Sequence, residues 1–201
     1  MFDDERDYSD LPFRSARSHA RCLDGRHDMR IARANTGYYR TFGLHVTTCL
    51  ECEPTRRNAW LTVDHRPRDW SGSLGEMHAG DPVQLVPRRP AVAGGVGRID
   101  LQVRGDLWGY VRLQLCGVDR RAVLVRVAVA EAQRRRGVAT LLVDAALAHG
   151  PGYDWSTVEV DTENDVFRAF RASLDLAEPV TIGTPHYCSH MRLANGEADW
   201  L

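Results

Sequence analysis

The feature that most constrains the fold of this chain is an apolar run followed closely by a cluster of arginines. Residues 122–130 are apolar with a single exception, which is typical of a strand buried on both faces. Residues 134–136 are all arginine, and residues 137–149 follow with one apolar helical face. Gly150-Pro151 ends this helical pattern. The sequence therefore predicts a buried strand, a tight basic turn and a helix.

Two segments before the apolar run have the pattern of a β-hairpin. Residues 99–103 alternate apolar and polar side chains with period two, and residues 107–115 form the predicted partner strand. The intervening Arg104-Gly105-Asp106 is expected to be the turn. The hairpin therefore precedes the buried strand directly.

The residues after the helix continue to alternate between strands and helices. A strand is predicted over residues 156–161, because its apolar residues alternate. Thr162, with Asp165 three residues later, resembles a capping box that begins a second helix. Two short strands, at residues 180–182 and 187–193, are expected to finish the domain. The fold class is therefore α/β (α+β), with a mixed, mostly antiparallel sheet flanked by helices.

The basic turn has the properties of an anion-binding site. The first turn of a helix leaves backbone N–H groups without intrahelical partners, at the positive end of the helix dipole. These groups bind a diphosphate well, and the small residues Gly137 and Ala139 let phosphates approach closely. Arginine side chains add charge-assisted contacts. Neither a Walker loop nor a dinucleotide Gly-x-Gly-x-x-Gly is present. The alternative is a solvated basic turn or a small nucleic-acid patch.

This stretch resembles the coenzyme signature of the GNAT superfamily of N-acetyltransferases. The family signature Arg/Gln-x-x-Gly-x-Gly/Ala is matched by Arg134, Gly137 and Ala139, and Asn164 with Phe170 resembles the second family motif. The resemblance covers about residues 96–195 and implies a GNAT-like fold that binds acetyl-coenzyme A. It further implies that the strand before the turn pairs with the pantetheine arm, that the turn holds the diphosphate, and that Asn164 touches the pantetheine. The implied coenzyme-binding residues are Val127, Ala128, Val129, Arg134, Arg135, Arg136, Gly137, Val138, Ala139, Thr140 and Asn164.

The resemblance does not supply a general acid or a general base. Many family members have a Tyr in the second helix that acts as the general acid, and this chain has Arg171 at that position. Some also have a Glu in the strand before the signature, and residues 122–129 contain none. Four other ionisable residues are each explained more readily as exposed or packing residues, so the catalytic residues stay unassigned: Glu159, Asp161, Tyr187 and His190.

The N-terminal half matches the family poorly. Residues 1–35 are expected to be a polar arm, disordered or loosely docked, that the fold does not need. Residues 36–95 are expected to contain strands at 41–48 and 58–63 and Gly/Pro-rich loops from residue 66 onward. Residues 96–201 form the predicted coenzyme-binding core. Because the helices that usually shape the acceptor pocket are not found, the acceptor cannot be read from the sequence.

Two groups of His and Cys have spacings that metal ligands use. His45, Cys49 and Cys52 form His-x-x-x-Cys-x-x-Cys, and His65 or Cys22 would be the fourth ligand. The favoured interpretation is a strand with two buried thiols. The second group is expected to lie on one face of a strand as packing and surface residues: His186, Cys188 and His190. No metal is therefore expected.

Charge and composition limit the partners. The formal net charge is −1, which disfavours nucleic acid and acidic lipid, including a zinc-bearing nucleic-acid binder. No run of eighteen apolar residues exists, so no membrane span is expected. The acidic start of the chain does not resemble a signal peptide, so we expect a cytoplasmic protein with reduced thiols.

Two functions follow from these patterns. The first is an N-acetyltransferase that moves the acetyl group of acetyl-coenzyme A to a primary amine of a small molecule or peptide. The alternative is an inactive GNAT-like module that senses acyl-coenzyme A or docks a partner protein, because the expected Tyr and Glu are missing. The expected partners are acetyl-coenzyme A and an unidentified amine, and a homodimer is left open.

Overall fold

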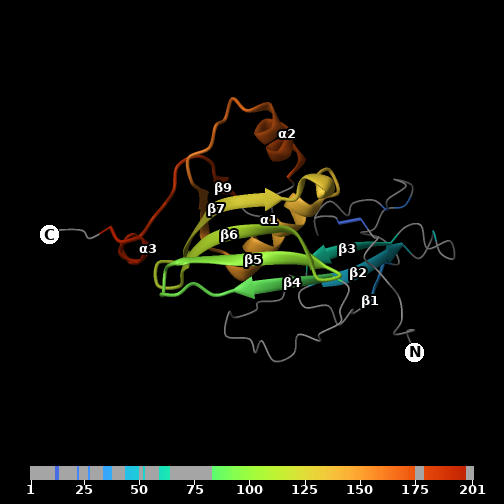
Figure 1. The fold of residues 1–201 in the computed structure, drawn as a ribbon, viewed down its shortest axis with the longest axis horizontal. Coiled ribbons are helices and arrows are strands. Elements are labelled where there is room, and N and C mark those ends of the chain that lie inside the picture. The colour runs from blue at the N-terminus through green and yellow to red at the C-terminus, as the bar shows by residue number, and fades with distance from the viewer. Residues whose placement is uncertain are drawn as a thin grey trace.

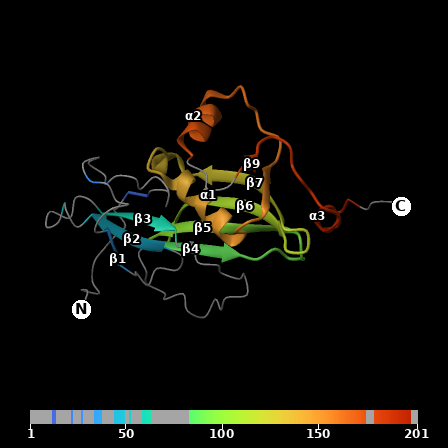
Figure 2. The same ribbon diagram turned by 180° about the vertical axis from the view of Figure 1, so that it is seen from behind.

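The computed structural model describes residues 12–13, 22, 27, 34–37, 44–49, 52, 59–63, 83–174 and 179–197. The strands among them form two sheets, which Figures 1 and 2 show from opposite sides. The smaller sheet has the order β1-β2-β3 and is antiparallel. Its strands are β1 (Ala34–Gly37), β2 (Leu44–Cys49) and β3 (Ala59–Val63).

The main sheet has the order β4-β5-β6-β7-β8-β9. Neighbouring strands are antiparallel from β4 to β7, and β8 and β9 join in parallel. This arrangement confirms the expected mixed, mostly antiparallel sheet. Its strands are β4 (Val83–Arg88), β5 (Val96–Val103), β6 (Asp106–Cys116), β7 (Arg121–Val129), β8 (Asp154–Thr157) and β9 (Val180–Thr181).

One long helix covers one face of the main sheet. This helix, α1 (Val138–His149), contacts β5, β6 and β7 and lies in front of the sheet in Figure 2. Alternate residues of β5, such as Ile99 and Leu101, share a fully buried cluster with Leu141 and Leu142 of α1. Burial of each such side chain stabilises the fold by roughly 1.5–3 kcal/mol. The other helical segments are η3 (Glu131–Gln133), α2 (Asp165–Ser173) and α3 (Ser189–Ala194).

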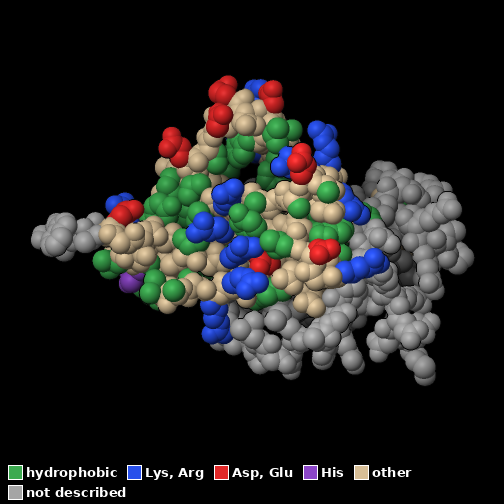
Figure 3. Space-filling view, viewed as in Figure 1, with side chains coloured by type: hydrophobic (Ala, Val, Ile, Leu, Met, Phe, Trp, Pro, Cys, Tyr) green, Lys and Arg blue, Asp and Glu red, His purple; other side chains and the backbone are tan. Residues whose placement is uncertain are grey.

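The opposite face of the main sheet carries a row of arginines. Arg88, Arg98, Arg112 and Arg126 lie directly opposite one another on β4, β5, β6 and β7. Figure 3 shows arginine side chains, in blue, gathered over the strands of this face. Asp100 is buried among them, and it accepts hydrogen bonds from Arg88 at 2.6 Å and from Arg98. This arginine row is therefore only partly neutralised.

Three expectations about single elements are wrong. Residues 83–88 form β4, whereas the region from residue 66 to 96 was expected to be loop; residues 66–82 lie outside the described residues. The segment 187–193 contains the helix α3 and no strand. The N-cap of α2 is Asn164 and not Thr162, because the Asn164 side chain accepts hydrogen bonds from the first turn. The predicted hairpin, buried strand and two main helices are confirmed.

Two described positions within residues 1–35 are buried. Phe13 is 5% exposed and belongs to the main core, where its ring packs edge-on against Trp108 with centroids 6.2 Å apart. The Leu61 N–H donates to the Pro12 carbonyl at 3.0 Å. Cys22 is 1% exposed. His27 is half-buried, Ala34 and Asn35 belong to β1, and the remaining positions of the predicted polar arm lie outside the described residues. Among the helices that are described, none has the length and apolar character needed to cross a bilayer.

Candidate functional site

Strands β7 and β8 diverge beside the predicted coenzyme strand. Their parallel pairing runs from Arg121–Asp154 to Leu124–Thr157, and the Val158 N–H donates to the Leu124 carbonyl at 3.1 Å. β7 continues to Val129, and in the described part of the chain only β6 pairs with this continuation. One edge of β7 is therefore open over its last residues.

The backbone at this edge points outward in a regular pattern. On the other side of β7, the Ala130 N–H donates to the Trp108 carbonyl at 2.9 Å. Because successive peptide groups in a strand point in opposite directions, Val127 and Val129 direct their N–H and C=O groups to the open edge. A register shift near Arg126 marks an irregularity in β7 just before this segment. The edge thus offers hydrogen bonds to an extended ligand.

The turn after β7 contains several N–H groups that have no acceptor within α1. Arg135 and Gly137 have positive φ angles of 63° and 79°, a backbone pattern that forms anion-binding concavities. Gly137 is the N-cap of α1 and provides no side chain to cap it, and the Leu141 N–H donates to its carbonyl. The preceding three N–H groups, at residues 138–140, have no intrahelical acceptor. This turn is therefore suited to bind phosphate oxygens.

The three arginines of the turn are exposed at the surface. The Arg136 guanidinium lies 4.7 Å from the centre of the Trp108 ring and donates to Gln133 Oε1 at 2.7 Å. These two contacts fix the orientation of the Arg136 side chain. Neither Arg134 nor Arg135 has a contact of this kind with the described residues, so both side chains can turn toward an anion in the turn. The predicted Val127–Val129 strand and the 134–140 turn are thus brought together by the fold.

Comparison with known proteins decides the family. The model of the acetyltransferase (GNAT) family matches residues 64–172, which is more than half of the chain. The chain belongs to the GNAT acetyltransferase family. No curated protein sequence matches it.

Solved structures of acetyltransferases resemble parts of this GNAT chain. A nourseothricin acetyltransferase is 24% identical, with a TM-score of 0.33, and the match covers 39% of this chain and 48% of that one. An aminoglycoside acetyltransferase from an uncultured soil metagenomic sample was solved with sisomicin and with trehalose. It is 15% identical, with a TM-score of 0.37, and the match covers 47% of this chain and 66% of that one. The chain therefore spans about half the length of the first structure and just under two thirds of the second.

Asn164 caps a helix in this GNAT protein. Its Oδ1 accepts hydrogen bonds from Val166 N–H at 2.9 Å and Phe167 N–H at 3.2 Å. The side-chain oxygen therefore fixes the start of α2, which the sequence had assigned to Thr162. The implied contact between Asn164 and pantetheine stays a prediction, for which the Nδ2 group would be the donor.

Two of the ionisable residues considered for catalysis lie far from the 134–140 turn. His190 contacts Asp119 at 3.0 Å, in the turn that joins β6 to β7 at their other end. β7 has nine residues, which separates its two ends by roughly 25 Å. Tyr187 packs against the buried cluster that contains Val123. Burial raises the pKa of Tyr187, and the negative charge of Glu197 raises it further. Both are therefore packing or surface residues, which is the interpretation that the sequence favoured.

Glu159 and Asp161 are exposed in the segment that follows β8. They follow the last residue of β8, where the sequence predicted that the strand would continue. Asp161 Oδ1 accepts a hydrogen bond from the Glu163 N–H at 3.0 Å. A surface hollow of about 420 Å³ lies elsewhere, beside Gly94, Leu113 and Gly117 at the far end of the sheet.

Two clusters of possible metal ligands occur among the described residues of the GNAT protein. The first contains Cys22, His27, Cys49 and Cys52. It includes His27, which the sequence interpretation missed, and the His45 side chain lies outside what the structure describes. The spacing Cys-x-x-x-x-His of Cys22 and His27, ahead of the Cys-x-x-Cys of Cys49 and Cys52, would have indicated that His27 is a ligand.

The second cluster joins the β6–β7 turn to α3. It contains Cys116, Asp119, Cys188 and His190. Cys188 is the N-cap of α3, so the expected strand with three aligned side chains is wrong. His186 instead pairs with Asp154 at 2.9 Å.

Proposed function

We propose that this chain binds acetyl-coenzyme A along the open edge of β7 and transfers the acetyl group to a primary amine. The observation that carries the proposal is the divergence of β7 from β8 next to a turn of unpaired N–H groups. An extended arm and a diphosphate are joined in that order in coenzyme A. The two neighbouring features fit these two parts of one molecule.

Individual residues would share the binding. The backbone of Val127 and Val129 would pair with amides of the pantetheine arm, as an added strand does. The N–H groups of residues 138–140 would hold the diphosphate, and Arg134 and Arg135 would neutralise its charge. Gly137 keeps the turn in its positive-φ conformation.

The chemistry requires little beyond correct positioning. Acetyl-coenzyme A supplies an acyl group activated as a thioester. The neutral amine forms a C–N bond to the acyl carbon, the C–S bond breaks, and the amine proton ends on the released thiolate or on water. N–H groups at the β7 edge would polarise the acyl carbonyl. No side chain of this chain is assigned as acid or base.

The exposed segment after β8 favours a cationic acceptor. Glu159, Asp161 and Glu163 are all exposed in the segment that follows β8, the strand next to β7. Their carboxylates would attract a protonated amine to the site. A small-molecule or peptide amine fits this surface. Assembly as a homodimer and a cytoplasmic location stay predictions of the sequence.

One observation favours the alternative of an inactive binding module. Arg171, at the family's usual Tyr position in α2, is exposed and lies in the last turn of that helix. An arginine does not donate a proton at neutral pH. The module would then sense acyl-coenzyme A or dock a partner without turnover.

Binding is tested first, by calorimetry with acetyl-coenzyme A and with free coenzyme A. Arg135→Ala should weaken both by about tenfold, because one charge-assisted contact to phosphate is lost. Arg120→Ala is the matched control, since Arg120 also has a positive φ angle and is exposed, but lies in the β6–β7 turn. Wild-type protein that binds neither ligand would contradict the proposal.

Turnover is tested by release of free thiol in the presence of amines. The panel should contain polyamines, aminoglycosides, amino acids and peptides. We expect release above the hydrolytic background with at least one cationic amine, and weaker release in Arg135→Ala at low coenzyme concentration. Tight binding without acceptor-dependent release across the panel would support the binding module.

A further inference from the structure

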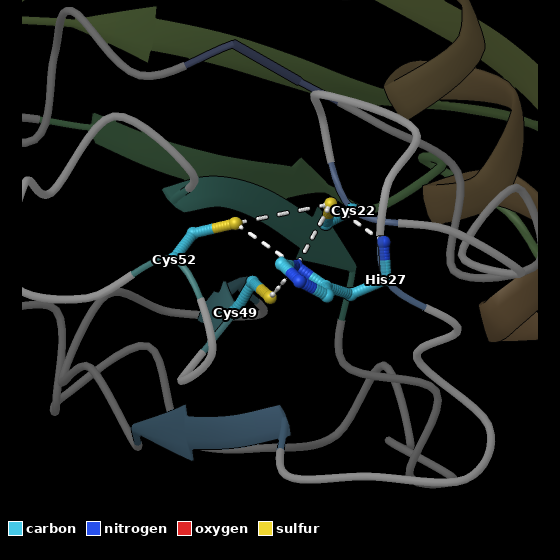
Figure 4. A group of neighbouring side chains, drawn as sticks. All are labelled: Cys22, His27, Cys49 and Cys52. Atoms are coloured by element: carbon cyan, nitrogen blue, oxygen red, sulfur yellow. Dashed lines mark hydrogen bonds between the residues drawn. The ribbon is translucent and has the colours of Figure 1, made fainter.

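Three thiols and one imidazole converge on a single point beside the smaller sheet. Figure 4 shows the side chains of Cys22, His27, Cys49 and Cys52 directed toward one another. Cys49 is the last residue of β2, whereas Cys22 and His27 come from a separate part of the sequence. The four ligand atoms all lie within 4.8 Å of one another.

The distances are those of a tetrahedral zinc site. His27 Nδ1 lies 3.2 Å from Cys52 Sγ, 3.7 Å from Cys49 Sγ and 3.8 Å from Cys22 Sγ. The sulfurs of Cys22 and Cys52 are 4.0 Å apart. Tetrahedral Zn²⁺, at about 2.3 Å from sulfur and 2.1 Å from nitrogen, sets two sulfurs about 3.8 Å apart and a sulfur and a nitrogen about 3.6 Å apart. The cluster therefore needs only small shifts to enclose the ion.

The backbone near the cluster supports a charged sulfur. The His27 N–H donates to Cys22 Sγ at 3.4 Å, and the Cys22 N–H donates to the His27 carbonyl at 3.0 Å. Hydrogen bonds from backbone N–H groups to a thiolate orient a metal ligand and stabilise its negative charge. Two hydrogen bonds thus hold Cys22 and His27 together as one ligand pair.

Among the described residues, few apolar side chains pack around the four ligands. The buried cluster beside the smaller sheet consists of Cys22, Cys49 and Trp60, with Cys52 packed against it. It is separate from the main core. Small units with few apolar residues often depend on a disulfide or a metal for stability. Cys22, Cys49 and Cys52 form no disulfide, and the sulfurs of Cys22 and Cys52 are far beyond the length of a disulfide bond.

We propose that Cys22, His27, Cys49 and Cys52 bind one Zn²⁺ as a structural site. Three thiolates and an imidazole suit zinc, and four protein ligands leave no open position for catalysis. The ion would fasten the Cys22–His27 segment to the end of β2. This inference goes beyond the proposed acyl transfer, because no ligand belongs to the β7 edge or the 134–140 turn. It replaces the sequence-based expectation of two buried thiols without metal.

Zinc content provides the first test. Full-length protein, purified without chelators, should contain about one more zinc per chain than Cys52→Ser and His27→Ala. Cys116→Ser is the control for loss of a thiol, since Cys116 lies in the other cluster. It should retain the zinc of the first site, and any metal that it loses reports on the second cluster. Equal zinc content in wild type, Cys52→Ser and His27→Ala would overturn the proposal.

A spectroscopic test does not depend on the folding of a weakened variant. Wild type loaded with Co²⁺ should show visible bands of tetrahedral cobalt and a near-ultraviolet charge-transfer band from thiolates. His27→Cys keeps four ligands, so it should still bind the metal and gain charge-transfer intensity from its fourth sulfur. A cobalt spectrum without thiolate bands, or one that His27→Cys leaves unchanged, would refute the assignment. Both readouts are independent of coenzyme binding and of turnover.

Discussion

The backbone carbonyl oxygen of Phe13 lies against Gly137, in the space that a Cβ atom on residue 137 would occupy. Gly137 also has a φ angle of 79°. Both facts make glycine the residue that fits there, before any ligand is considered. A bulky substitution at Gly137 would therefore confuse loss of folding with loss of coenzyme binding.

Gly137→Ala should lower the free energy of unfolding more than Gly105→Ala does. Gly105 has a φ angle of 86°, and no atom lies within 4 Å of its added Cβ, so it isolates the backbone cost of about 1–2 kcal/mol. The overlap with Phe13 should add about 1–3 kcal/mol at Gly137. Urea denaturation of both variants measures the difference. Equal destabilisation would show that the Phe13 segment moves away at little cost.

Phe13→Ala should destabilise the fold by about 3–5 kcal/mol, because the ring fills the main core. Val118→Ala is the control, since Val118 is 76% exposed and should change stability by less than about 0.5 kcal/mol. A chain that starts near Thr36 should lose cooperative thermal unfolding for the same reason. This outcome would reverse the expectation that residues 1–35 are dispensable, and a cooperative transition in the shortened chain would restore it.

Two substitutions in the arginine row should change the free energy of unfolding in opposite directions. Arg112→Gln should raise the free energy of unfolding by about 0.2–1 kcal/mol, because like charges on neighbouring strands repel. Arg98→Gln should lower it by at least about 1 kcal/mol, since the buried Asp100 then keeps only Arg88. Added salt should stabilise wild type more than Arg112→Gln. The same sign for both substitutions would mean that repulsion along the row is negligible.

The carboxyl group of Asp119 should make the stability of the fold depend on pH in the acidic range. Hydrogen bonds from Cys188, His190 and Cys116 lower the pKa of Asp119 below its ordinary value of 3.8. A carboxyl whose folded pKa is depressed stabilises the fold above the ordinary value, and this contribution disappears as pH falls through the folded pKa. Asp119→Asn should therefore flatten the loss of melting temperature below about pH 4. Asp106→Asn, in the other turn of β6, is the control, and identical acid curves for Asp119→Asn and wild type would argue against the effect.

The strand, turn and helix around residues 122–149 were predictable because each has a strong local signal. The apolar run defines β7, and Gly137 marks the start of α1. β4 was missed because Pro87 lies inside it. A proline is tolerated there, since β4 is the edge strand of the main sheet. Such a position cannot be recognised until the strand order is known.

The remaining errors have a tertiary origin. His186, Cys188 and His190 alternate as in a strand, yet α3 forms because Met191 is fully buried and Cys188 begins a short helix. The partnership of Cys22 and His27 with Cys49 depends on how distant segments pack, and spacing along the chain does not reveal it. The sequence also assigned no residue to proton transfer.

The open edge of β7 also bears on how this protein behaves in concentrated solution. A row of outward-facing N–H and C=O groups is a template onto which a strand of another molecule can add. If the coenzyme arm covers that row, the edge of the loaded protein cannot pair with another strand, whereas the edge of the ligand-free protein can. Light scattering should then show self-association that falls as coenzyme A is added, so that the same backbone groups of Val127 and Val129 govern both ligand capture and solubility.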